Sequence, residues 1–270
     1  GFTHVAEPLG AWIDQGRDLA FAQRFLAGAT EGWAMALTSL RDLYADPCDP
    51  ADAGGDFGAE AHRLGEVTAD LHVAMAEAFG RAPGNNHEWA DLMDEQMKRV
   101  LPDDVAESAR RIISRLRELD DAGPAIRVHG DYHLGQVMRT DTGWYVLDFE
   151  GEPARALSER IRPTSPLKDV TGMLRSLAYA PIVAMATQDD DLTGLARAWE
   201  ARNRSCFLDG YFTRAEEADL LPSDTAARTT VLTAFELDKA VYEVAYEAAH
   251  RPDWVDIPTR AVAELVRTAR

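Results

Sequence analysis

Apolar residues recur at helical spacing along most of the chain. Leu64, Val67, Leu71 and Met75 lie three or four positions apart, which places them on one face of a helix. Thr30 is a suitable N-cap for the first helix, and Pro102 with Asp103 is a typical helix start. The spacing predicts helices over residues 33–43, 59–79, 89–100, 103–119, 167–180, 192–210, 225–249 and 258–268, with loops at 46–58 and 80–86.

The middle of the chain has a different pattern. Residues 125–128 are short and apolar, and the strand-like segments 136–139 and 144–149 are separated by Thr-Asp-Thr-Gly. Asp and Gly at that position are typical of a hairpin turn. Near the N-terminus, residues 19–25 form an apolar run that we interpret as a buried strand. We therefore expect an α+β protein that is mainly helical and carries a small β-hairpin insert.

Composition and charge narrow the class of protein. The apolar fraction of 46% and charged fraction of 27% are ordinary for a globular chain. A net charge of −18 argues against nucleic acid as a partner, although a divalent cation would still allow a nucleotide to bind. The chain has no apolar run long enough to span a membrane, and its first residues lack a secretory pattern. We expect a cytoplasmic protein with no membrane partner, whose Cys48 and Cys206 are reduced thiols.

The segment 127–153 concentrates the polar residues that suggest chemistry: RVHGDYHLGQVMRTDTGWYVLDFEGEP. Phosphoryl transfer requires a carboxylate that orients the attacking hydroxyl, followed by oxygen ligands for Mg²⁺. Asp131 is the candidate base, and Gln136 and Asp148 are candidate Mg²⁺ ligands. Glu150 would share a strand face with Asp148 and could add a second carboxylate.

Two histidines in this segment need separate interpretation. We expect His129 to anchor the loop through bonds between its side chain and the backbone, and His133 either to do the same or to contact substrate. A zinc site is the alternative for this pair, but no cysteine lies near, and Gly130 and Gly135 favour a tight loop. A loop whose residues only bond one another is the simplest alternative for the whole group.

Segments along the whole chain resemble one family. HGDYHLGQ (129–136) followed by LDFEGEP (147–153) resembles the actinobacterial maltokinases, which belong to the aminoglycoside-phosphotransferase-like branch of the protein-kinase-like fold, with glucosamine kinases as close relatives. The resemblance implies ATP- and Mg²⁺-dependent transfer of the γ-phosphate to a sugar hydroxyl, first of maltose, giving maltose 1-phosphate, with glucosamine as the alternative acceptor. Further similar segments are GWAM (32–35), GGDF (54–57), SPL (165–167), DV (169–170), MLRS (173–176), ELDKAVYE (236–243), HRP (250–252), Trp254 and IP (257–258).

The resemblance also implies roles for single residues. Asp131 matches the catalytic residue, with His133 beside it, and Gln136 and Asp148 match the Mg²⁺ ligands, with Glu150 in the same signature. Asp169 matches a residue that supports the catalytic loop. Residues implied to read adenine from a hinge are Gln23, Arg24, Phe25 and Leu26, and those implied to bind the sugar are His129, Tyr242, Glu243, Tyr246, Arg251 and Trp254. Core packing is an equal alternative for the tyrosines and the tryptophan.

Three departures from the family pattern matter. The first lysine is Lys98, so the phosphate-gripping lysine of an N-lobe has no match.

We expect residues 1–30 to be a hinge and the end of an N-lobe or intermediate region. We expect 31–270 to be a helical C-lobe, with a catalytic loop and metal-binding hairpin at 125–153 and C-terminal sugar-binding helices. The N-lobe would be largely absent, which leaves a non-catalytic sugar-binding fragment as an alternative. It would also expose an apolar patch along residues 19–26 that could mediate association.

The other two departures are local. Asp56, Phe57 and Gly58 spell a metal-binding triplet of protein kinases but precede the catalytic loop, so we interpret them as the start of the next helix. Tyr132 and the pair Ala248–Ala249 differ from the family pattern near the expected sugar pocket. These differences put the exact sugar in doubt. A phosphotransferase that acts on aminoglycosides or choline is a further alternative, because the acidic net charge would suit cationic substrates.

Overall fold

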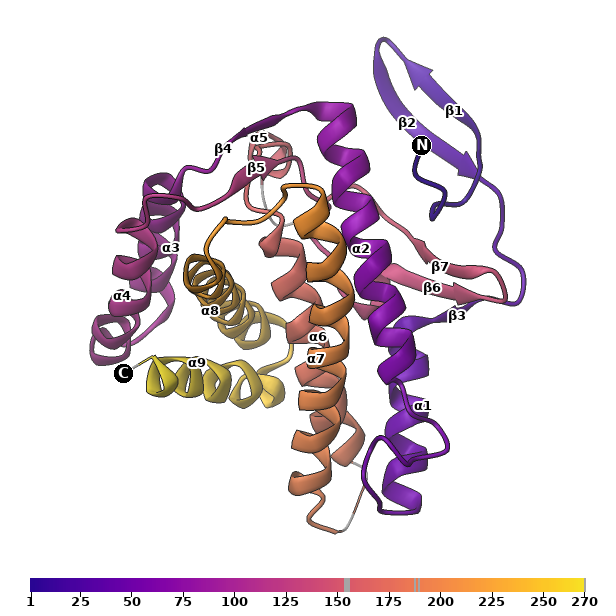
Figure 1. Ribbon diagram of the computed structural model, residues 1–270, viewed down its shortest axis with the longest axis vertical. Helices are drawn as coiled ribbons and strands as arrows, with labels where there is room; N and C mark the ends of the chain where they lie inside the picture. The colour runs from indigo at the N-terminus through magenta and orange to yellow at the C-terminus, as the bar shows by residue number, and fades with distance from the viewer. Residues whose placement is uncertain (153–155, 187, 189, 270) are drawn as a thin grey trace.

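Helices make up most of the molecule (Figure 1), as the apolar spacing predicts. The computed structural model describes residues 1–152, 156–186, 188 and 190–269, so Pro153 and Arg270, which end two of the expected regions, lie outside it. The helices are α1 (Gly32–Ala45), α2 (Gly58–Phe79), α3 (Asn86–Val100), α4 (Asp103–Arg117), α5 (Leu157–Arg160), α6 (Leu167–Met185), α7 (Thr193–Glu217), α8 (Thr225–His250) and α9 (Asp256–Thr268), with short 3₁₀ turns at Leu134–Gln136 and Pro252–Trp254.

The expected helices are confirmed, but several boundaries differ. Helix α3 begins one turn early because the Asn85 side chain accepts a hydrogen bond from the Glu88 N–H and caps it. Helix α6 continues through Pro181, where we expected it to end. The prediction that Thr30 caps α1 is wrong, because Thr30 and Glu31 form a short strand and no side-chain cap is present.

Among the described residues, the strands form three small sheets, with orders β1-β2, β3-β6-β7 and β4-β5. The predicted hairpin is confirmed as β6 and β7, with Thr140 opposite Gly143 at the turn. It ends sooner than expected because Asp148 adopts the left-handed conformation (φ 54°), so the expected placement of Asp148 and Glu150 on one strand face is wrong. The strands are β1 (Pro8–Asp14), β2 (Arg17–Gln23), β3 (Thr30–Glu31), β4 (Arg81–Pro83), β5 (Pro124–Ile126), β6 (Val137–Thr140) and β7 (Gly143–Val146).

The N-terminal hairpin of β1 and β2 stands apart from the helices (Figure 1). The prediction of a buried strand at 19–25 is wrong in its burial, since Leu19, Phe21 and Phe25 are 53%, 64% and 86% exposed. The expected exposed apolar patch along residues 19–26 is confirmed by the same values. An apolar run indicates surface that favours burial but does not identify what covers it.

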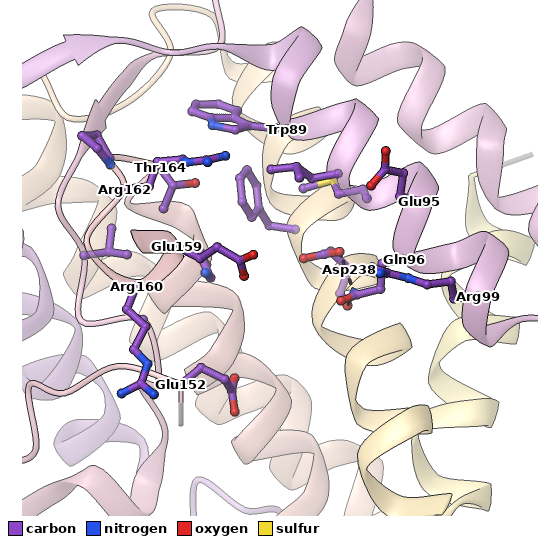
Figure 2. A pocket seen from close by; sticks show the side chains of 17 residues that line it. Trp89, Glu95, Gln96, Arg99, Glu152, Glu159, Arg160, Arg162, Thr164 and Asp238 are labelled. Atoms are coloured by element: carbon purple, nitrogen blue, oxygen red, sulfur yellow. Dashed lines mark hydrogen bonds between the residues drawn. The ribbon is translucent and has the colours of Figure 1, made fainter. Parts of the chain in front are cut away.

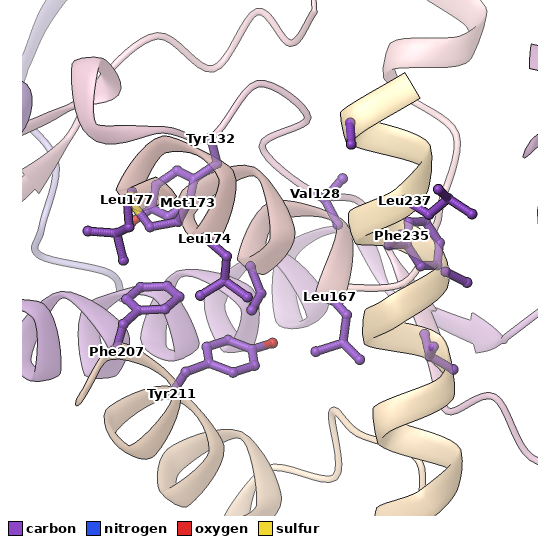
Figure 3. Packing of buried hydrophobic residues seen from close by; sticks show 14 of the residues in the cluster. Val128, Tyr132, Leu167, Met173, Leu174, Leu177, Phe207, Tyr211, Phe235 and Leu237 are labelled. Carbon is purple, nitrogen blue, oxygen red and sulfur yellow. The ribbon is translucent and has the colours of Figure 1, made fainter. Parts of the chain in front are cut away.

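The hydrophobic core places α6 directly beneath the catalytic loop. A Cβ atom on Gly172 of α6 would lie 2.5 Å from the Tyr132 carbonyl oxygen, so the helix and the loop backbone are in contact. Figure 3 shows Tyr132 packed with core residues of α6 and α7, among them Leu174 and Phe207. The loop therefore rests on the most buried part of the molecule.

Helices α2 and α7 cross at two glycines. A Cβ on Gly65 would lie 2.1 Å from the Phe207 carbonyl oxygen, and one on Gly210 would lie 2.2 Å from the His62 carbonyl oxygen. Asp56 accepts a hydrogen bond from the Gly58 N–H at the start of α2, which confirms that the Asp-Phe-Gly triplet begins a helix. Its carboxylate also pairs with Arg202 of α7.

Two further expectations concern the thiols and the membrane. Cys48 and Cys206 are both free, which confirms the prediction of unpaired cysteines. Across the described part of the chain, no helix has the length and apolar character needed to cross a membrane.

Candidate active site

Asp169, in the first turn of α6, holds the catalytic loop by its backbone. Its carboxylate accepts hydrogen bonds from the His129 N–H at 2.7 Å and the Gly130 N–H at 2.8 Å. His72 of α2 contacts the same carboxylate through Nε2 at 3.1 Å. Burial alone raises the pKa of Asp169, but the hydrogen bonds from His72 and Gly130 outweigh it and leave the pKa below its ordinary value. This is the arrangement expected of a residue that supports the loop.

His129 joins the loop to the segment after β7. Its Nδ1 accepts a long hydrogen bond from the Asp131 N–H, so Nε2 carries the proton and donates to the Leu147 carbonyl oxygen at 2.7 Å. The expected bonds from the His129 side chain to the backbone are therefore present. The residue is buried and lines neither of the two pockets described below, so its contact with substrate stays a prediction.

The two candidate Mg²⁺ ligands meet although they lie twelve positions apart. Gln136 Nε2 donates to Asp148 Oδ2 at 3.2 Å, and the Glu150 N–H lies 3.4 Å from Asp148 Oδ1. Within the described ranges, no three or more His, Cys, Asp or Glu side chains are grouped as a metal-binding set. Carboxylate and amide oxygens with few protein ligands suit Mg²⁺, which keeps waters and takes oxygens from phosphates. The pair therefore fits this ion.

Asp131 faces two groups that can carry positive charge. Its Oδ1 lies 4.0 Å from His133 Nε2 and 3.9 Å from Lys239 Nζ of α8. Burial lowers the pKa of His133 below its ordinary value, and the Asp131 carboxylate opposes that shift. Lys239 also contacts Glu152 Oε2 at 3.2 Å, and the Tyr242 hydroxyl donates to Glu152 Oε1 at 2.6 Å.

A pocket of about 250 Å³ begins at Gly130, next to the candidate base (Figure 2). Its walls come from α3, α8 and the segment 159–168, with Glu152 at its inner end. A smaller hollow of about 20 Å³ also touches Gly130 and Glu152 and extends to Lys239 and Tyr242. The candidate base therefore follows a residue that lines a partly open pocket of mixed polar and apolar character, although Asp131 itself lines neither pocket.

The pocket lining combines an aromatic wall with hydrogen-bonding groups. The rings of Trp89 and Phe235 meet edge to face, 5.5 Å between centroids. Gln96 Nε2 donates to Asp238 Oδ1 at 2.7 Å, and Figure 2 shows this pair beside the cavity. An apolar ring face and paired donors and acceptors are the features that a sugar ring with its hydroxyls requires.

The residues that the resemblance assigns to the sugar do not share one surface. Tyr242 lines the smaller hollow, and Tyr246 stacks on it with 6.2 Å between centroids. Glu243 is buried and pairs with Arg175 at 2.9 Å, and its burial raises its pKa although Arg175 opposes the shift. Arg251 binds Glu247 and lies 4.5 Å above the Trp254 ring. Tyr242 is thus the member of this set that lines a pocket.

The expected adenine hinge lies at the exposed end of β2. The Arg24 N–H donates to the Glu7 carbonyl oxygen at 2.8 Å, and the Arg24 guanidinium pairs with the Glu7 carboxylate at 2.6 Å. The Arg24 N–H thus already has a partner. Gln23 and Phe25 flank Arg24, Leu26 follows, and adenine recognition by this segment stays a prediction.

The model of the phosphotransferase enzyme family matches residues 49–217, a range that contains the catalytic loop, the hairpin and Asp169. The chain belongs to this phosphotransferase family. Its fold is accordingly the kinase-like fold of that family, as the resemblance implies.

The relatives of this phosphotransferase chain include glucosamine kinases. That of Streptacidiphilus jiangxiensis is 31% identical over 287 residues, covering 98% of this chain and 63% of the relative. That of Mycolicibacterium smegmatis is 29% identical over 279 residues, covering 98% and 68%. The chain therefore spans less than two thirds of the first relative. The expected absence of an N-lobe stays a prediction.

Solved glucosamine kinase structures also match this phosphotransferase. Crystal form A gives a TM-score of 0.84 at 28% identity and covers 99% of this chain and 67% of that chain. The complex with glucosamine, ADP and inorganic phosphate gives 0.81 at 28% identity and covers 98% and 65%. These matches support the phosphotransferase family that the sequence resemblance implies, and they do not support maltokinase in particular.

Sequence reasoning missed several residues of the candidate site. Trp89, Gln96 and Asp238 line the pocket, Glu152 pairs with Lys239, and Lys239 approaches the candidate base. A signal existed for the last three, because Glu152 lies in the LDFEGEP segment and Asp238 and Lys239 in ELDKAVYE. No sequence pattern links α3 to the catalytic loop, so Trp89 and Gln96 could be found only from the fold.

Proposed function

We propose that this chain carries the catalytic and acceptor-binding part of an ATP- and Mg²⁺-dependent sugar kinase whose acceptor is glucosamine. The observation that carries the proposal is the pocket that begins at Gly130, the residue before Asp131, and combines apolar with hydrogen-bonding groups in its lining. Its volume of about 250 Å³ lies below the usual range for drug-sized ligands, which favours a single sugar ring over maltose. The named activity of the two curated relatives supports glucosamine as that sugar.

The proposed roles follow from the positions of the groups. Asp131 orients the acceptor hydroxyl and accepts its proton as the bond to phosphorus forms. The Trp89–Phe235 wall packs against the apolar face of the sugar ring, while Gln96 and Asp238 bind its polar groups. A protonated amino group would be attracted by the Asp238 carboxylate. The product would be glucosamine 6-phosphate.

Gln136 and Asp148 would hold Mg²⁺, with Glu150 close enough to contribute through water. When bound, the ion offsets negative charge on the transferred phosphate. The contact between Gln136 Nε2 and Asp148 Oδ2 keeps the two side chains together before any cation arrives. We also propose that residues 23–26 contact adenine.

A panel of acceptors tests the proposal in the intact protein. Glucosamine, maltose, N-acetylglucosamine, an aminoglycoside and choline are each offered with Mg·ATP, and ADP release is measured. We expect the highest kcat/KM with glucosamine, and faster transfer to maltose would restore the maltokinase interpretation. Binding of glucosamine without ADP release would indicate a sugar-binding protein that is not a kinase.

The substitution Asp131→Asn separates chemistry from binding. We expect kcat to fall by about 10³-fold, because the amide cannot accept the proton, while glucosamine affinity changes little. A coupled ADP assay and calorimetry measure the two quantities. Asp141→Asn, in the exposed turn of the hairpin, is the matched control and should retain full turnover. Substantial turnover of Asp131→Asn would remove Asp131 from its proposed role.

A further inference from the structure

Lysine is rare in this chain, and one of its three lysines lies at the candidate active site. The sequence contains Lys98, Lys168 and Lys239 among its 28 basic residues. The Lys239 ammonium lies 3.9 Å from Asp131 Oδ1 and 3.2 Å from Glu152 Oε2. The side chain comes from α8, far from the loop in sequence, and no role has been given to it so far.

Three contacts define where this ammonium lies. Glu152 binds it directly, and Glu152 is itself held by the Tyr242 hydroxyl at 2.6 Å. The ammonium also lies 4.8 Å from the centroid of the Tyr242 ring, a favourable position for a cation. Lys239 and Tyr242 are three positions apart on α8 and so share a face of the helix. The Lys239 side chain is only 24% exposed, which limits screening by solvent.

The position of the ammonium bears on the orientation of the candidate base. The terminal torsion of an aspartate is soft, so its two oxygens exchange places unless a neighbour fixes them. Lys239 and His133 both approach Oδ1 of Asp131. Burial lowers the pKa of His133 and so disfavours a charge on its ring, which leaves the Lys239 ammonium as the other group that approaches Oδ1.

We propose that Lys239 is a positioning residue for phosphoryl transfer: its ammonium, held by Glu152 and Tyr242, attracts Oδ1 of Asp131 and turns Oδ2 toward the acceptor hydroxyl. The inference rests on the proposed kinase function and adds to it a residue outside the catalytic loop. It also explains why Glu152 is kept buried beside the loop, since Glu152 fixes the ammonium rather than the substrate.

A purely structural ion pair between Lys239 and Glu152 is the competing explanation. Such a pair would affect the free energy of unfolding and leave kcat unchanged. A positioning role requires the positive charge during turnover. It therefore affects kcat more than KM, and a replacement cation can restore it.

The test compares kcat and KM for glucosamine and Mg·ATP in the intact protein. Lys239→Met retains most of the side-chain length without the charge, and we expect kcat to fall by about 10²-fold with each KM within about threefold. Lys239→Arg should recover at least part of that loss. Lys98→Met removes an exposed lysine of α3 that pairs with Asp94, and it should match the wild type.

A second variant guards against a folding defect. Lys239→Ala leaves room for a small amine, so added ethylammonium should raise its kcat in proportion to concentration, which a lost structural contact would not allow. Wild-type turnover by Lys239→Met would overturn the inference alone. The inference is also overturned if the loss of turnover comes with a lower Tm and neither Lys239→Arg nor ethylammonium reverses it. Failure of the wild type to phosphorylate any sugar overturns the proposed function, and the inference with it.

Discussion

The Asp169 carboxylate is 1% exposed, and it accepts hydrogen bonds from two consecutive backbone N–H groups of the catalytic loop. Asp169→Asn removes the negative charge. It also replaces one carboxylate oxygen by an NH₂ group, which would face a backbone N–H of the loop, so that two donors oppose each other. We expect the free energy of unfolding at pH 7 to fall by about 3 kcal/mol, because breaking a buried charged contact leaves its partners unsatisfied. Urea denaturation of the two proteins measures the difference.

The same comparison has a defined dependence on pH. The pKa of Asp169 is lower in the folded protein than its ordinary value of 3.8, so its stabilising effect is present above that value. The advantage of the wild type over Asp169→Asn should shrink as pH falls below 3.8 and through the lower folded pKa. An unchanged difference, as far into acid as both proteins remain folded, would show that the charge of Asp169 does not contribute.

At this scale, local residues were predictable and distant ones were not. Gln136 and Asp148 lie at the two ends of one short hairpin, so their spacing was enough to predict that they meet. The grouping of Asp131 with them stays a prediction. Lys239 and Gln96 reach the same region from helices whose crossing depends on the whole core. The sequence could mark those two as polar positions on helices but could not place them near Asp131.

At the scale of elements, the α2–α7 crossing depends on two glycines, because neither position has room for a Cβ atom. We expect Gly65→Ala to lower the free energy of unfolding by about 3 kcal/mol, because the new methyl would meet the Phe207 backbone at 2.1 Å and the helices must separate. Chemical denaturation measures the loss. Gly194→Ala, in the first turn of α7 with open space around it, is the control and should be neutral or slightly stabilising. Equal stability of both variants would contradict the close crossing.

Helices were the elements most easily predicted, because a long apolar face repeats its signal over several turns. The short strands β1, β3, β4 and β5 have no such repetition, and they exist because a partner strand lies beside them. The end of β7 was missed for another reason. Asp148 adopts the left-handed conformation, which aspartate tolerates better than most residues do, but its residue type alone is too weak a signal to end a predicted strand.

For the whole molecule, the hairpin of β1 and β2 is the main exposed apolar surface among the described residues. Trp12 and Phe21 are 66% and 64% exposed, so we expect this chain to self-associate as its concentration rises. The double substitution Trp12→Ser with Phe21→Ser should weaken that association by about tenfold or more, as judged by sedimentation velocity. Leu157→Ser, on the short helix α5, is the control. Identical association of all three proteins would show that the hairpin is not the contact.

Under the proposed function, the walls of the acceptor pocket and the groups that would handle phosphate lie on different parts of the chain. Helices α3 and α8 supply Trp89, Gln96 and Asp238, while the loop before the hairpin supplies Asp131 and the segment after β7 supplies Asp148. The two sets adjoin at Gly130 and Glu152. In evolutionary terms, substitutions on two helices can alter the preferred acceptor while the transfer machinery is inherited unchanged. A lineage with this fold can therefore acquire a new substrate gradually, without passing through an inactive ancestor.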